Sequence, residues 1–329
     1  MKKSLIALAV AGAMTAPIVA QADATLYGSL RAGIKSADDQ KLNVEDESSR
    51  IGIKGDVDLG LESTKGLFVF EQAVSTESGA WGSGRLAYLG ATGNWGTALI
   101  GRQYHPFYTM IESKTGIFNS AGNDFGEAFQ FGNIAHKRES NTVAYATPNM
   151  NGLQAVAGIV MDGGSDNNPA EEDLDAYNIG VNYAANGLDA GISYGAANDS
   201  DNWEILGVAA SYQIDAFTVA GKYVDGSIDA QNTDFSNWEI AGVYTMGATS
   251  FKARYGNAEI ETTGAADLDG DQWGVEVEQK LGKRGRVYVG YTDFDTEGQA
   301  IASSIYSMVK GEAKTVAKDT LVLGYRLDF

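Results

Sequence analysis

The final ten residues, TLVLGYRLDF (320–329), contain the pattern that decides the fold. Four apolar residues, from Leu321 to Leu327, alternate with residues that are mostly small or polar. A β-strand points successive side chains to opposite faces, so this stretch predicts a strand with one apolar and one polar face. The chain ends on an aromatic residue, Phe329, which belongs to the apolar face.

The same alternation recurs toward the N-terminus, for example in 286–291, 272–277 and 177–184. A soluble sandwich or barrel would turn these apolar faces inward, whereas an outer-membrane barrel turns them toward lipid. Tyrosines near the strand ends favour the membrane barrel, because interfacial girdles are aromatic. The polar faces combine charged residues with glycine, which would make a poor soluble core.

Short and long connections alternate along the chain, as they do in transmembrane barrels. Seven short turns and eight long loops predict an all-β fold, a transmembrane antiparallel β-barrel of sixteen strands with periplasmic turns and external loops. A barrel of 16–18 strands leaves an aqueous lumen. The expected long loops lie near 36–47, 75–83, 104–136, 162–175, 196–202, 225–236, 257–270 and 293–317.

Residues 1–22 have the features of a secretory signal peptide: two lysines, an apolar stretch, and Ala20 and Ala22 at a small-x-small cleavage site. The apolar stretch is shorter than the ~20 residues that a membrane-spanning helix needs. We therefore expect an exported single domain over 23–329.

Composition excludes several classes of function. The chain has 24 Lys+Arg against 43 Asp+Glu, a formal charge of −19, which argues against nucleic-acid binding. It has no Cys, which excludes disulfides, thiol catalysis and Cys-ligated zinc. The calcium-like acidic run 267–278 lacks glycine at the required position. No catalytic motif is found, so we predict no enzyme activity, catalytic residue, metal or cofactor.

Several short motifs, in this order and spacing, are similar to those of general bacterial (Gram-negative) outer-membrane porins. They are LYG at 26–28, SRIGIKG at 49–55, GRLAYLG at 84–90, GRQY at 101–104 and the terminal Phe329. The resemblance spans the mature chain. It implies homotrimers in the outer membrane, among lipids that include lipopolysaccharide, that pass small hydrophilic solutes and ions by passive diffusion. It also implies that Phe329 is part of an assembly signal.

The resemblance further implies that the third loop, 104–136, folds into the lumen and narrows it. Arginines on the wall would face acidic groups of this loop, and such opposed charges create a transverse field. A charge on the lipid face costs ~2–4 kcal/mol, which independently predicts that Arg50 and Arg85 point inward. The expected basic cluster is Arg50, Arg85 and Arg138, with Arg31 and Arg102 as further candidates, and the expected acidic residues are Glu112, Asp124 and Glu127.

Four alternatives remain open from the sequence alone. The constriction charges could serve only to stabilise the folded-in loop. A sugar-specific channel would need a run of lumenal aromatics, and an exported β-sandwich that binds or adheres would stay soluble without detergent. The acidic stretch 162–175 is either a solvated loop or a divalent-cation site that bridges to lipid headgroups.

Overall fold

The computed structural model describes residues 23–38, 40–120, 137–161, 174–197, 202–310 and 313–329. The predicted signal peptide, 1–22, lies outside the described residues. The strands are β1 (Asp23–Ala37), β2 (Asn43–Asp46), β3 (Arg50–Leu61), β4 (Thr64–Val74), β5 (Trp81–Gly93), β6 (Gly96–Tyr104), β7 (Arg138–Glu139), β8 (Thr142–Ala146), β9 (Leu153–Met161), β10 (Leu174–Ala185), β11 (Leu188–Ala197), β12 (Trp203–Ile214), β13 (Phe217–Ile228), β14 (Thr233–Met246), β15 (Thr249–Thr262), β16 (Leu268–Leu281), β17 (Gly285–Phe294) and β18 (Asp319–Asp328).

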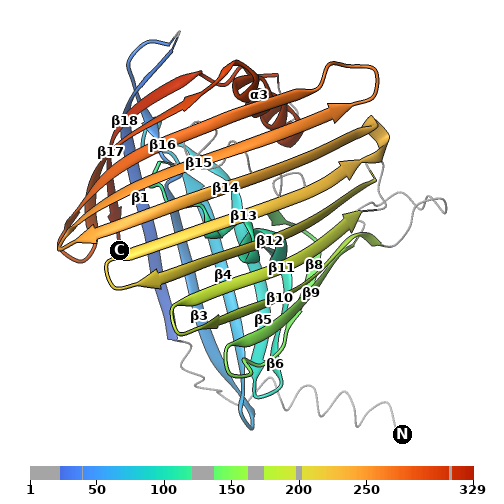
Figure 1. The fold of residues 1–329 in the computed structure, drawn as a ribbon. Coiled ribbons are helices and arrows are strands. Elements are labelled where there is room, and N and C mark those ends of the chain that lie inside the picture. Colours follow the sequence, from blue (N-terminus) through green and yellow to red (C-terminus); the bar gives the residue numbers. More distant parts are fainter. Residues whose placement is uncertain (1–22, 39, 121–136, 162–173, 198–201, 311–312) are drawn as a thin grey trace, which may run out of the picture.

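These strands form one closed antiparallel sheet (Figure 1). The pairs β2/β3 and β7/β8 are each a single stave interrupted by a few residues, so the barrel has sixteen staves, as predicted. β1 closes the barrel because it pairs with β3 on one side and with β18 on the other. At this seam Gly28 and Phe329 exchange two backbone hydrogen bonds, each 3.1 Å long.

The apolar faces point outward, which confirms the prediction on which the membrane barrel depends. In β18, Leu323 is 51% exposed, whereas Thr320 on the opposite face is 1% exposed. The outward-facing side chains form a belt around the barrel, which we call the outward belt. It contains the expected tyrosines, among them Tyr212, Tyr223 and Tyr325. An exported soluble sandwich, with these side chains in a dry core, is therefore excluded.

The connections match the prediction at the short turns but differ at two of the expected long loops. The turn between β10 and β11, for example, is Asn186-Gly187 with both φ angles positive (55° and 83°), as two-residue hairpins prefer. The expected loop 225–236 is mostly strand: β13 and β14 stay paired to Ile228 and Thr233, with one short helix, η3 (Asp229–Gln231), between them. The expected loop 257–270 shrinks similarly, because β15 extends to Thr262 and β16 begins at Leu268.

Two loop segments contain further helices. The third loop contains α2 (Pro106–Met110) and η1 (Glu112–Lys114), and the last loop contains α3 (Thr296–Lys310). No helix in the described residues has the length and apolar character needed to cross a bilayer.

The described part of the third loop, 104–120, folds into the lumen, as predicted, because glycines on the inner wall leave room for it. A Cβ at Gly180 of β10 would lie 2.5 Å from the Met110 sulfur. A Cβ at Gly207 of β12 would lie 2.6 Å from the Phe107 ring. α2 therefore packs directly on the wall, and its Phe107 is fully buried.

Candidate constriction site

Four of the five predicted arginines line one cavity between the barrel wall and the third loop. Arg31 comes from β1, Arg50 from β3, Arg85 from β5 and Arg138 from β7. The third loop faces them with residues 116 and 118–120. The remaining described lining residues are Ser48, Tyr104, Tyr108, Lys137 and Arg326.

Two of these arginines share a carboxylate that sequence analysis did not single out. Glu71 of β4 lies 2.6 Å from Arg85 Nε and 3.6 Å from Arg50 Nε. Glu71 is 4% exposed, while its neighbour Phe70 is 58% exposed on the lipid side. This alternation is the signal that could have identified Glu71 as an inward charge on the same wall.

Arg31 belongs to a row of like charges on neighbouring strands. It lies opposite Arg326 in the β1–β18 register, and Arg326 lies opposite Arg286 in the β17–β18 register. Asp328 compensates part of this row, with Arg326 Nε at 2.8 Å and Arg286 Nη2 at 3.1 Å. The Arg31 guanidinium donates to Ser29 Oγ over 2.9 Å. Directly opposed like charges destabilise a sheet, so this row works against stability and is consistent with a functional role.

Lys137 and Arg138, which follow the third loop in the chain, lie over aromatic rings of Tyr104 and Tyr108 at the start of the loop. Arg138 lies 5.0 Å from the centre of the Tyr104 ring, and Lys137 lies 4.4 Å from that of Tyr108. The two rings stack with their centroids 5.3 Å apart. These cation–π contacts hold both ends of the loop together and keep the two cations at the cavity.

The structure does not bring Arg102 into this cavity. Arg102 donates from Nε to the Gly84 carbonyl (3.2 Å) and from Nη1 to Ser140 Oγ (2.9 Å). The next residue, Gln103, takes the inward position and is 4% exposed. Arg102 therefore ties β5 and the residues before β8 to β6.

Glu112 does not face the arginines either, which corrects the expectation for this residue. It is fully buried and pairs with Lys222 of β13, whose ammonium also lies 3.0 Å from Glu239 of β14. Thr115 of the loop donates to the same Glu239 over 2.6 Å. Glu112 was expected at the constriction because it is an acidic residue of the third loop. Its buried ion pair with Lys222 instead anchors the loop to the barrel wall. The other two predicted acids, Asp124 and Glu127, lie outside the described residues.

The end of the described loop segment is fixed to β16. The Asn119 backbone N–H and side-chain amide donate to the two Glu276 oxygens over 2.9 and 2.8 Å. Its side chain also donates to Glu278 over 2.6 Å. Lys252 neutralises both carboxylates at 2.7 and 2.9 Å. The described loop segment therefore has two anchors, Glu112 at β13 and β14 and Asn119 at β16. The second anchor adjoins the arginines, because the Asn119 carbonyl also accepts from Arg31 over 3.5 Å.

Comparison with known proteins gives consistent results. The family model for the Gram-negative porins matches residues 7–299. The major outer membrane protein P.IB of Neisseria meningitidis is 28% identical over 344 residues, covering 96% of this chain and 97% of the relative. Outer membrane protein U of Vibrio parahaemolyticus is 26% identical over 258 residues, covering 74% and 70%.

Solved structures share the fold. The loop L8 deletion mutant of OmpT from Vibrio cholerae superposes with a TM-score of 0.74 at 19% identity, covering 94% of this chain and 99% of that one. The anion-selective porin of Comamonas acidovorans superposes with a TM-score of 0.70 at 18% identity, covering 94% and 100%.

Proposed function

Because this chain belongs to the Gram-negative porin family, we propose that its outer-membrane channel selects solutes at the cavity described above. One side of this cavity is the arginine wall, formed by Arg31, Arg50, Arg85 and Arg138, and the other side is the third loop. The protein is a porin: a passive, non-enzymatic channel for small hydrophilic solutes and ions. Its lumen is lined by the polar strand faces, so water and hydrated solutes cross where lipid would exclude them.

The proposed selectivity is a preference for anions. One observation supports it: the described residues that line the cavity include six cationic side chains and no carboxylate. Two nearby carboxylates compensate only part of that charge: Glu71 serves both Arg50 and Arg85, and Asp328 serves Arg326. Selectivity is determined where the path is narrow and the walls exclude water, because charges act most strongly on an ion there. The chain's net charge of −19 has less influence, because no acidic side chain is among the described residues that line this cavity.

Reversal potentials in planar bilayers under a salt gradient test this proposal. The parent channel should prefer anions, and Arg85→Ser should shift the reversal potential toward cations. Arg102→Ser is the matched control, because Arg102 lies outside the cavity and should leave the potential unchanged. The potentials should be measured at about 0.1 M salt, where the Debye length is ~10 Å. At 1 M salt the Debye length falls to ~3 Å, and the salt would screen the charges of the arginine wall. Equal potentials for parent and Arg85→Ser would refute the role of the arginine wall.

A sugar-specific channel has less support. The cavity has three aromatic residues among its described lining, Tyr104, Tyr108 and Phe118. The two tyrosines stack on each other and on cations, and Phe118 lies 5.5 Å from the Arg254 guanidinium. Protein groups thus cover both tyrosine rings and one face of Phe118, which reduces the stacking surface for a sugar.

We further propose that the protein is a homotrimer whose outward belt contacts outer-membrane lipid, including lipopolysaccharide. The family supports the trimer, and one OmpT structure of the same fold is described as a trimer form. The outward tyrosines Tyr223 and Tyr255 support lipid contact at the external rim. Chemical cross-linking in detergent would give a trimer band, and lipopolysaccharide would remain with the purified protein. A monomer band alone, or protein free of lipopolysaccharide, would contradict the respective proposal.

A further inference from the structure

The helix of the last loop, α3, has one apolar face. Gly298, Ile301, Ala302 and Ile305 follow the i, i+3, i+4, i+7 spacing that places side chains on one side of a helix. Gly298 and these three apolar residues are all buried, and Ile301 is completely inaccessible. The helix therefore docks by this face on another part of the protein.

The docking surface is the inner face of the barrel wall. α3 packs mainly against β16 and also against β15. On β16 it lies over Gly270, which shares the inward face with Gln272 and Glu276, both almost fully buried. A Cβ at Gly270 would lie 2.1 Å from the Gly298 nitrogen, and a Cβ at Gly298 would lie 2.4 Å from the Asp271 carbonyl oxygen. Two glycines thus permit a helix-to-strand contact that no larger residue allows.

The segment that follows α3 also returns along the helix. Gln299 donates to the Val316 carbonyl over 2.8 Å, and the Val316 N–H donates to Ser303 Oγ over 2.9 Å. Val316 is 1% exposed. The helix and this return segment therefore form one packed unit inside the external end of the barrel.

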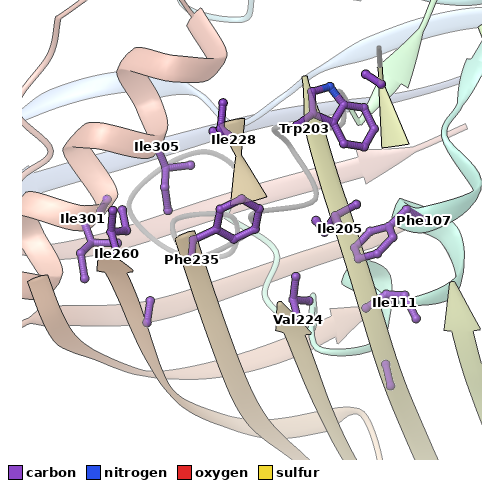
Figure 2. Close-up of a cluster of buried hydrophobic side chains, with 14 of the residues drawn as sticks. Phe107, Ile111, Trp203, Ile205, Val224, Ile228, Phe235, Ile260, Ile301 and Ile305 are labelled. Atoms are coloured by element: carbon purple, nitrogen blue, oxygen red, sulfur yellow. The ribbon is translucent and has the colours of Figure 1, made fainter. Parts of the chain in front are cut away.

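Apolar contacts extend from α3 down the same wall toward the third loop (Figure 2). Ile301 and Ile305 lie beside Ile260, and Phe107 and Ile111 of the third loop lie at the other end beside Ile205. Phe235 and Val224 occupy the region between them. This side of the lumen is filled by protein. The arginine cavity lies away from this cluster, at β1, β3, β5 and β7.

We propose that α3 is a second constriction, at the external mouth, which restricts solute size before the arginine cavity is reached. An α-helix with its side chains is ~10–12 Å wide, so a helix docked inside the barrel removes that width from the mouth. This inference does not depend on which ion the arginine wall prefers.

Undocking the helix tests the proposal. Gly298→Val and Gly270→Val should each release α3 from the wall. Because the ~10 Å helix then leaves the mouth, single-channel conductance should rise by roughly 1.5-fold or more. Larger neutral polymers should also enter the channel from the external side. The reversal potential should not change, since the arginine cavity is untouched. Gly242→Val on β14 is the control, because a Cβ there would meet only the Thr218 carbonyl oxygen, at 4.0 Å.

A chemical reporter verifies that the helix has left the wall. The chain has no cysteine, so Ile301→Cys provides a single thiol that is buried while α3 is docked. A hydrophilic maleimide should label it in the Gly298→Val background and leave it unlabelled in the parent background. If labelling stays blocked, replacing 296–310 by a Gly-Ser linker removes the helix outright. Unchanged conductance and polymer cut-off in a labelled variant, or in the helix-free variant, would overturn the proposal.

Discussion

At the scale of single residues, the constriction depends on how far Glu71 offsets its two arginines. This carboxylate touches both Arg85 and Arg50 and is almost fully buried. We expect Glu71→Gln to increase the preference for anions, because two guanidinium groups lose a shared negative charge while the side chain keeps its shape. Reversal potentials at low salt measure this effect, and a shift toward cations would contradict it.

Lys222 is a second residue whose removal has a definite expected effect. It lies between Glu112 of the third loop and Glu239 of the wall, and the side chains of all three are completely buried. Breaking a buried ion pair on one side costs about 3–5 kcal/mol, because a charge is left without compensation. Lys222→Met should therefore loosen the third loop, which would appear as larger open-channel current noise and a lower unfolding temperature.

Lys114→Met is the matched control, since it lies in the same loop. Lys114 pairs with Asp189 at 2.5 Å, but the Asp189 side chain is 41% exposed to water. The Lys114 side chain is 7% exposed, but without it Asp189 still contacts water and accepts a hydrogen bond from Asn182 over 2.8 Å. No charge is left buried without compensation, so Lys114→Met should have a smaller effect than Lys222→Met. Equal noise and equal unfolding temperatures for the two variants would exclude an anchoring role for Lys222.

At the scale of elements, the closing seam depends on an aromatic ring lying over a glycine. The Phe329 ring of the terminal residue occupies the space over Gly28 of β1, where a Cβ would lie 2.4 Å from it. Gly28→Ala should thus displace Phe329 and weaken closure, which lowers the temperature at which the folded barrel dissociates on gels. Gly221→Ala, where the added Cβ meets only a carbonyl oxygen at 3.5 Å, should leave that temperature unchanged. The role of Phe329 as an assembly signal stays a prediction.

The strands and the inward arginines could be predicted because both follow from alternation along a single strand. Arg50 and Arg85 were identified this way, and the same rule applied to β4 would have found Glu71. Contacts between distant elements could not be predicted in this way. Nothing in the third loop indicates that Glu112 meets Lys222, 110 residues away. Likewise, Gly270 and Gly298 look like ordinary strand and turn glycines until the fold brings them together.

At the scale of the whole molecule, the charges are separated: the cavity is cationic, while acids gather at the external ends of the strands. Residues 225–236 include Asp225, Asp229 and Asp234, and the next hairpin end adds Asp267 and Asp269. These groups lie at the external mouth, and their field should repel anions from it over about one Debye length, ~10 Å at 0.1 M. The arginines lie deeper between protein walls, where salt screens them less.

The anion preference should consequently depend on which side of the membrane holds the dilute solution. When the dilute solution is on the external side, the acidic residues at the external mouth are poorly screened and should reduce the preference for anions. When the dilute solution is on the periplasmic side, these residues are screened and the preference should be larger. Adding Mg²⁺ to the external side should remove most of the difference, because a divalent cation neutralises carboxylates at the rim. Reversal potentials measured with oriented channels and both gradients check this. Equal magnitudes in both orientations would mean that the rim charges do not influence permeation.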